Sequence, residues 1–200
     1  MGHSQQSKRD TYAKIVGTAA RRLRERGLAG IGVADLMADA GLTVGGFYKH
    51  FASRSELVAQ AITAMENGWD TVFANAKASG QRTPQLFDAL VDSYLSLEHR
   101  DHPAEGGCLF AALSTEIGRS DDEVRAAATR KLETALAKLA AVFDDRRAPA
   151  ARAAAILTYA ALVGAISLAR TTNDADLSRE ILSAVARGLK NMLRPEPSRS

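Results

Sequence analysis

Apolar residues recur along this chain at intervals of three and four, the spacing of one face of an α-helix. No convincing run of alternating β-branched and polar residues, which would indicate a strand, is found in the sequence. The pattern therefore predicts an all-α protein of about nine helices. The first helix is expected over about 10–26 and ends at Gly27, a residue suited to the left-handed conformation that follows many helices. Its inward-facing residues are Ile15, Val16, Ala19, Ala20 and Leu23.

Two short helices are predicted over about 33–40 and 44–50, on either side of Gly41-Leu42-Thr43. Their apolar residues would pack the two helices across a tight turn, as in a helix-turn-helix motif. This apolar set consists of Leu36, Met37, Ala40, Leu42, Phe47 and Phe51. Thr43 is expected to cap the second helix, whose outward side would meet a partner such as DNA. The outward residues are Thr43, Val44, Gly45, Gly46, Tyr48 and Lys49.

The rest of the chain is predicted to form a helical bundle. Capping-box patterns at residues 53–56 and 120–123 mark two helix starts. The helix that starts at 53–56 is expected to continue to about Phe73. The following helix in the chain, which has no capping box, is expected over about 83–100. Further helices are expected over about 107–117, 149–171 and 175–193.

Composition is that of a soluble globular protein, since 46% of the 200 residues are hydrophobic and 24% are charged. The longest apolar stretch, residues 153–169, is rich in alanine and interrupted by polar residues, which favours a buried helix over a membrane span. The first ten residues lack the apolar segment of a secretory signal. A cytoplasmic protein without membrane contact is therefore expected.

Positive charge is concentrated near the N-terminus. Residues 1–54 hold nine basic and four acidic residues, a net charge of +5, whereas the whole chain carries +3. The remainder of the chain therefore carries −2. A basic lobe is typical of proteins that bind a polyanion such as DNA, although a solvated basic helix face gives the same pattern.

Residues 27–57 resemble the signature of the TetR family of transcriptional regulators. The likeness rests on Ala-Gly-Leu-Thr-Val-Gly-Gly-Phe-Tyr-Lys-His-Phe at 40–51 and on Ser-Arg-Ser-Glu-Leu at 53–57. The resemblance implies a homodimeric repressor with a helix-turn-helix DNA-binding domain over residues 1–54 and a ligand-sensing and dimerisation domain over residues 55–200. The third helix would enter the major groove of a palindromic operator in double-stranded DNA.

The resemblance also implies which residues contact DNA. Those nearest the bases would be Thr43, Val44, Gly45 and Gly46, and those near phosphates would be Tyr48, Lys49 and His50. Lys8 and Arg54 are further candidates for phosphate anchors, with solvated surface charge as the alternative. Two positions depart from the family pattern, because Gly32 replaces a capping threonine and Val44 replaces a frequently polar residue. A helical scaffold or ligand-binding protein that keeps the fold without binding DNA is the competing interpretation.

The C-terminal domain shows no pattern that indicates catalysis. It contains no nucleophile triad, phosphate-binding loop or paired-carboxylate arrangement, so neither an enzyme nor a cofactor is expected. Four potential metal ligands lie close together in sequence, but their spacing is irregular and crosses a predicted loop, so no metal site is expected. These four are His99, His102, Glu105 and Cys108.

The family resemblance implies that the aromatic residues of this domain line a pocket for a small hydrophobic effector, although core packing explains each of them better when taken singly. They are Trp69, Phe73, Phe87, Tyr94, Phe110 and Tyr159. Cys108, the one cysteine, follows two glycines and opens a predicted helix, where the helix dipole favours negative charge. The segment 107–110, with Leu113 and Glu116, resembles TetR-type regulators that respond to electrophiles or oxidants. A buried, unreactive cysteine is the alternative.

The last two helices are predicted to form the dimer interface. Two such helices from each subunit would make a symmetric four-helix contact, with packing inside the monomer as the alternative. The interface residues expected are Leu162, Ile166, Ile181, Val185, Leu189 and Met192.

Overall fold

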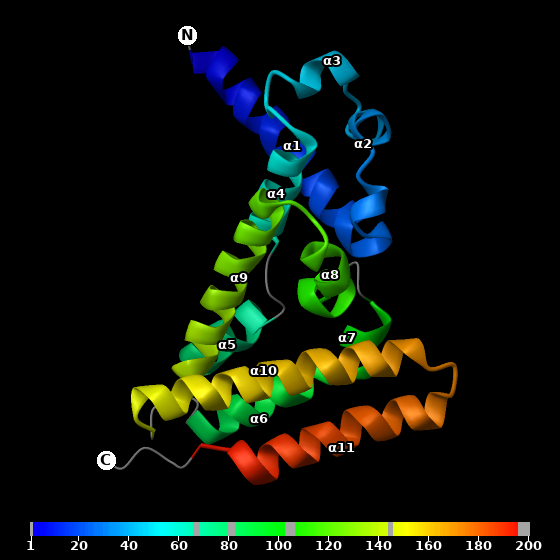
Figure 1. The fold of residues 1–200 in the computed structure, drawn as a ribbon. Helices are drawn as coiled ribbons and strands as arrows, with labels where there is room; N and C mark the ends of the chain where they lie inside the picture. The colour runs from blue at the N-terminus through cyan, green and yellow to red at the C-terminus, as the bar shows by residue number, and fades with distance from the viewer. Residues whose placement is uncertain (1, 66–68, 80–82, 103–106, 144–145, 196–200) are drawn as a thin grey trace. The chain divides into compact units, whose positions relative to one another are not determined.

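The computed structural model describes residues 2–65, 69–79, 83–102, 107–143 and 146–195, and all regular structure in these ranges is helical (Figure 1). The helices are α1 Gly2–Arg26, the 3-10 helix η1 Leu28–Gly30, α2 Val33–Asp39, α3 Val44–Phe47, α4 Arg54–Ala64, α5 Trp69–Ser79, α6 Thr83–Tyr94, α7 Leu97–Asp101, α8 Leu109–Gly118, α9 Asp122–Ala140, α10 Ala148–Thr171 and α11 Ala175–Leu193. The predicted all-α fold class is confirmed. Two helices predicted as continuous each appear as a pair, α4 with α5 and α6 with α7.

The chain divides into two compact units. The HTH unit consists of Met1–Met65 and Ala112–Lys131, and the bundle unit consists of Glu66–Ala111 and Leu132–Ser200. This division differs from the predicted boundary after residue 54, because α4 packs along α1 and the turn between α8 and α9 belongs to the HTH unit. The functional division into a DNA-binding domain over 1–54 and a sensing domain over 55–200 stays a prediction.

The core of the HTH unit is built where α1 meets α4 and the helix-turn-helix. The inward stripe predicted for α1 is buried, and α2, α3 and α4 supply the apolar partners. The fully buried large side chains here are Ile15, Leu23, Ile31, Leu36, Met37, Phe47, Phe51, Leu57 and Ile62. Burial of this size stabilises the unit by roughly 1.5–3 kcal/mol for each large apolar side chain.

A buried arginine joins α1 to α2. Arg22 is only 5% exposed, and its Nε donates a hydrogen bond of 2.7 Å to the Asp39 carboxylate. Its other N–H groups donate to the backbone oxygens of Gly30 and Asp35, at 3.1 and 3.2 Å. Arg22 was expected from the sequence only to add positive charge, although its place three residues after the buried Ala19 puts it on the inward face of α1.

The η1 turn is held by a carboxylate from α8. Gly27 has a φ of +69°, and Glu116 Oε2 accepts a 2.8 Å hydrogen bond from the backbone N–H of Leu28. A Cβ added to Gly27 would lie 2.6 Å from Glu116 Oε1. Both the backbone conformation and the neighbouring carboxylate therefore require glycine at this position. Ser55 of α4 also donates a hydrogen bond to Asp121 at the start of α9.

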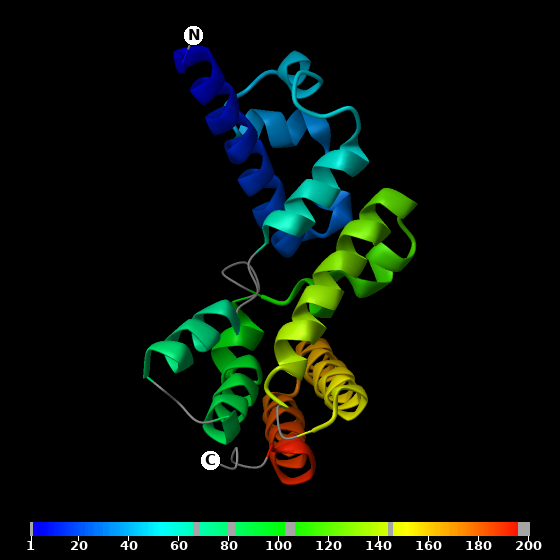
Figure 2. The ribbon, with the colours of Figure 1, turned by 90° about the vertical axis from the view of Figure 1, so that its left-hand side faces the viewer.

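The bundle unit is centred on α10 and α11, which run side by side in opposite directions (Figure 1), with α6 against α11. Figure 2 views the two helices nearly end-on. By length and composition alone α10 could cross a membrane, but 44% of its most apolar segment is buried within the protein. The core helix of a soluble protein meets the same criteria, so this one helix is weak evidence for a membrane span.

Candidate functional site

The turn between α2 and α3 fixes the direction of α3. Gly41 has a φ of +67°, and its N–H donates to Ala38 O while the N–H of Leu42 donates to Met37 O, each at 2.8 Å. These two hydrogen bonds are those of a Schellman motif, which ends α2 sharply. Thr43 is the N-cap residue of α3, as predicted, but its hydroxyl makes no capping hydrogen bond.

One side of α3 is anchored and the other is exposed. Phe47 is 1% exposed and packs on Phe51, with a distance of 5.5 Å between ring centroids. On the outward side, Val44 is 46% exposed and Tyr48 is 70% exposed. The anchored side therefore holds a helix of only four residues whose other side offers apolar and phenolic groups to a partner.

Gly45 lies on this outward surface without an internal reason to be glycine. A Cβ added there would meet nothing within 4 Å, and its φ is not positive. Glycine within a helix is less favourable than alanine by roughly 0.5–1 kcal/mol. Glycine at this position therefore does not stabilise the helix, but it allows another molecule to approach the backbone closely.

A basic groove lies on the HTH unit between α1 and the turn that follows α3. Its volume is about 370 Å³, and it is lined by Gln5, Lys8, Arg9, Tyr12, Lys49 and His50. The groove exists because α1 begins at Gly2, well before the predicted start near residue 10, and so carries Lys8 on a rigid helix. Basic side chains from two separate segments facing one groove are suited to bind backbone phosphates.

The side chain of Arg54 donates two hydrogen bonds within the HTH unit. Its Nε donates to Ile31 O at 2.7 Å, and its Nη2 donates to Leu28 O. These hydrogen bonds hold the carbonyl groups of the η1 turn. Arg54 stays exposed, so its contact with a phosphate remains a prediction beside this structural role.

In the bundle unit, Cys108 is half-buried and lies directly before α8 rather than within it. Its Sγ is 3.6 Å from Tyr159 Oη, and its backbone N–H donates to His99 Nε2 at 3.2 Å. The other ring nitrogen, His99 Nδ1, lies 2.6 Å from Tyr94 O and must donate to it. Both bonds require a neutral imidazole, and burial lowers the pKa of His99, which favours that form.

Four of the six predicted effector-binding aromatics come together near Cys108. The ring of Trp69 lies 5.4 Å from that of Tyr94 and 5.1 Å from that of Tyr159, and Phe110 lies 6.0 Å from Tyr159. The four residues come from α5, α6, α8 and α10, so tertiary packing gathers them. Cys108, Trp69, Tyr94, Phe110 and Tyr159 are called the thiol cluster below.

The other two predicted aromatics belong to the bundle core. Phe87 is fully buried and packs edge-on against Phe143, with 5.4 Å between ring centroids. Phe73 is partly buried against the same core. Core packing explains both residues, so neither is assigned to the thiol cluster.

Among the described residues, Trp69 Nε1 is a buried donor without a hydrogen-bond partner, on a side chain that is 4% exposed. Tyr94 Oη is also buried, on a side chain that is 5% exposed, and interacts with the Cys108 thiol. Leaving a buried donor unsatisfied costs roughly 1–3 kcal/mol, so such groups call for an explanation. Burial raises the pKa of Tyr94 well above its usual value, and that of Tyr159 likewise, with the nearby Cys108 thiol adding to both shifts. Both phenols therefore remain O–H donors at neutral pH.

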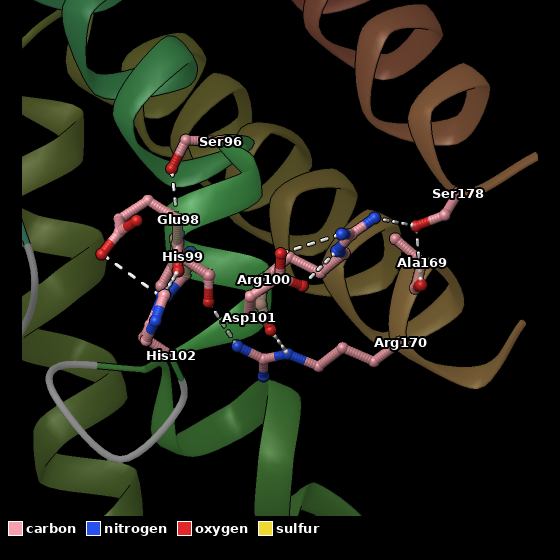
Figure 3. A network of polar contacts seen from close by, with 9 residues as sticks. All are labelled: Ser96, Glu98, His99, Arg100, Asp101, His102, Ala169, Arg170 and Ser178. Atoms are coloured by element: carbon pink, nitrogen blue, oxygen red, sulfur yellow. Dashed lines mark hydrogen bonds and ion pairs between the residues drawn. The ribbon is translucent and has the colours of Figure 1, made fainter. Parts of the chain in front are cut away.

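A polar network holds α7, the helix that carries His99 (Figure 3). Arg170 of α10 donates to the backbone oxygens of His99 and Arg100, at 2.7 and 3.0 Å. Arg100 in turn donates to Ser178 of α11 at 2.8 Å and pairs with Asp101. This network was not predicted from the sequence, because contacts between residues about 70 positions apart leave no local signal.

The four potential metal ligands noted in the sequence do not form a metal site in the part of the chain that the structure describes. His99 uses both ring nitrogens for backbone contacts, and His102 Nδ1 lies 3.2 Å from Glu98 Oε1. Glu105 is outside the described residues.

Several residues predicted for a dimer interface are buried in the chain's own core. Leu162 and Ile166 are 0% exposed and Leu189 is 4% exposed, so they offer no surface to a partner. Ile181 and Val185 are partly buried, and Met192 is exposed. The exposed large apolar residues of α10 and α11 are Ile156, Leu157, Leu168, Leu177 and Met192. The interface prediction is therefore wrong for Leu162, Ile166 and Leu189, whereas Ile181, Val185 and Met192 stay predictions.

Comparison with known proteins agrees with the fold and with the helix-turn-helix. Residues 15–61 match the family model of bacterial regulatory proteins of the tetR family, and residues 84–185 match the tetracyclin repressor-like C-terminal domain. An uncharacterised HTH-type transcriptional regulator of Mycobacterium tuberculosis is 32% identical, over 94% of this chain and 96% of the relative. The transcriptional regulator AcuR of Cereibacter sphaeroides is 24% identical, over 68% of this chain and 63% of its own length.

Solved structures show the same fold. The reduced form of Escherichia coli NemR matches with a TM-score of 0.72 at 20% identity, covering 93% of this chain and 98% of NemR. A TetR transcriptional regulator from Chloroflexus aurantiacus matches with a TM-score of 0.72 at 23% identity, covering 96% and 100% of the two chains. These relatives are regulators rather than enzymes. The chain belongs to the TetR family of transcriptional regulators.

Proposed function

We propose that this regulator is a repressor that binds a palindromic operator through α3 and the basic groove beside it. The observation that carries this proposal is the outward surface of α3, where the exposed Val44 and Tyr48 flank a glycine that the fold does not require. Val44 would contact a thymine methyl group, because it has no hydrogen-bonding group to offer a base edge. Lys8 and Lys49 would contact phosphates from the two sides of the groove.

The active form would be a homodimer that pairs through α10 and α11. The exposed large apolar side chains of these helices support this, because a dimer contact would remove them from water. A twofold dimer would present its two α3 helices about one DNA turn apart, which matches a palindromic operator. Such a protein would act in the cytoplasm, where its DNA is.

The effector would be a small hydrophobic or thiol-reactive compound that acts at the thiol cluster. The support is a half-buried cysteine next to two phenols, and a similar solved structure that is described as a reduced form. Cys108 directly precedes α8, which also carries Glu116, the acceptor for the Leu28 N–H. Modification of Cys108 would act on DNA affinity through α8, by favouring a conformation that binds DNA less tightly.

The DNA-binding part is tested with the duplex that the purified protein retains from sheared genomic DNA. Log affinity should fall linearly with log salt concentration, since bound phosphates release counterions. Lys49→Ala and Lys8→Ala should each make this slope shallower by about one for every phosphate that is no longer bound, thus about two in a homodimer. Lys138→Ala, which removes a paired lysine of the bundle unit, is the control and should leave the slope unchanged. A slope that neither variant alters would contradict the groove assignment.

The sensing part is tested on the same duplex with iodoacetamide. Cys108 is the one cysteine of the chain, so alkylation can occur at no other thiol. Cys108→Ser should keep its affinity for the duplex within about twofold, whereas only the wild-type protein should be released by iodoacetamide. Equal release of both proteins would refute the thiol-sensing role and leave the DNA-binding role intact.

A further inference from the structure

Tyr12 places a phenol in the basic groove of the HTH unit. It lies four residues after Lys8, so the two side chains share one face of α1, and they line the groove together with Lys49 and His50. Tyr12 is half-buried, and no hydrogen bond of its hydroxyl is found within the part of the chain that the structure describes. The hydroxyl can therefore donate to an acceptor that arrives with a ligand.

Aromatic stacking holds the ring of Tyr12 in place. The ring lies on that of Phe51, with 5.0 Å between centroids and an angle of 22° between the two planes. Phe51 is 1% exposed and packs in turn on Phe47, the residue that anchors α3. The three rings connect α1 to α3 through the core of the HTH unit. The Tyr12 hydroxyl therefore keeps a defined position relative to the outward side of α3.

The charges around this hydroxyl favour an anion that carries acceptor oxygens. Lys8, Arg9 and Lys49 line the groove, and no carboxylate is among the described residues that line it. Burial raises the pKa of Tyr12, and the negative charge of Glu56 adds to the shift. The phenol therefore keeps its proton at neutral pH and donates it. A backbone phosphate of DNA is an anion of this kind, because its oxygens accept hydrogen bonds and it has no proton to donate.

We propose that the Tyr12 hydroxyl donates a hydrogen bond to an operator phosphate that lies in the basic groove. This inference rests on the proposed DNA-binding function and adds a neutral contact to the contacts of the two lysines. Because phosphates carry no sequence information, the contact fixes how α1 lies on the duplex and contributes equally on every base sequence.

Tyr12→Phe tests the contact, because it keeps the stacked ring and removes only the hydroxyl. Affinity of the full-length protein for the duplex retained from genomic DNA should fall about tenfold, since each half of the homodimer loses one partly solvated hydrogen bond. The slope of log affinity against log salt should stay unchanged, because a neutral hydroxyl releases no counterion, in contrast to Lys8→Ala. Thr129→Ala is the control and should bind as the wild type does, since it removes an exposed hydroxyl of α9 that does not line the groove.

Duplexes with an uncharged methylphosphonate at one phosphate of each half-site locate the contact. On the duplex substituted at the phosphate that Tyr12 binds, Tyr12→Phe should cost less than about threefold, whereas on the other duplexes it should cost the full tenfold. The same cost on every duplex, or no cost on any, assigns Tyr12 to packing on Phe51 and overturns the inference. The salt slopes of Lys8→Ala and Lys49→Ala test the proposed DNA-binding function without Tyr12, so the two proposals can fail separately.

Discussion

Arg22→Met is expected to lower the free energy of unfolding of the HTH unit by about 3 kcal/mol. The substitution keeps an apolar stem in the core but removes the donor to the oxygens of Gly30 and Asp35 and leaves Asp39 with only the distant Arg21, at 4.0 Å. Loss of one partner from a buried ion pair costs roughly 3–5 kcal/mol, and the lower end applies because the Asp39 side chain is 40% exposed. Chemical denaturation followed by circular dichroism measures the loss, and amide hydrogen exchange locates it in α1 and α2.

The neighbouring arginine provides a matched control for this experiment. Arg21 lies on the exposed side of the same helix, with 53% of its side chain accessible, and pairs with Glu25 at 3.1 Å and with Asp39 at 4.0 Å. Arg21→Met should therefore change stability by less than about 0.5 kcal/mol. If both variants lose the same stability, the buried network around Arg22 is not what holds α1 to α2.

Gly27→Ala is expected to destabilise the HTH unit by about 2 kcal/mol and to weaken DNA binding in parallel. The backbone at Gly27, with φ +69° and ψ −167°, costs a residue with a side chain roughly 1–3 kcal/mol. The new Cβ would also displace the Glu116 carboxylate from the Leu28 N–H. Glu116→Ala should cost about 1.5 kcal/mol by itself, since a hydrogen bond to a charged group is removed.

The double variant separates these two effects. Because alanine at position 27 already displaces the carboxylate, Gly27→Ala with Glu116→Ala should cost about 1 kcal/mol less than the sum of the single losses. Gly17→Ala is the control, since a Cβ at that helical position meets nothing within 4 Å and should leave stability equal or slightly higher. Strict additivity would show that the contact between Gly27 and Glu116 contributes nothing.

The helical elements were predictable because apolar spacing and capping residues act locally. α11 begins and ends where the sequence predicts, and Ser53 accepts the capping hydrogen bond from Glu56 N at 2.9 Å. The start of α9 is displaced by one residue, because Asp121 rather than Ser120 caps it through the N–H of Val124. Competing caps of nearly equal strength cannot be ranked from sequence.

The destinations of long polar side chains could not be predicted in the same way. In the sequence Arg22 and Arg54 look alike as basic residues, yet Arg22 is buried while Arg54 stays exposed, and both donate to backbone oxygens of the HTH unit. Glu116 resembled part of a family motif, but the residue that it contacts, Leu28, is 88 positions away in the sequence. Such side chains have several partners of similar strength within reach, so tertiary packing decides among them.

Gly45 has a consequence for how this regulator can diversify. Since the fold imposes no requirement at that position, another residue can replace Gly45 without a loss of folding stability. Such a substitution would change only the affinity for operator DNA. Different residues of one four-residue helix therefore contact DNA and hold the helix in place, and Phe47 is the buried residue that holds it. New operator preferences can therefore arise at Gly45 and Val44 while the scaffold stays intact.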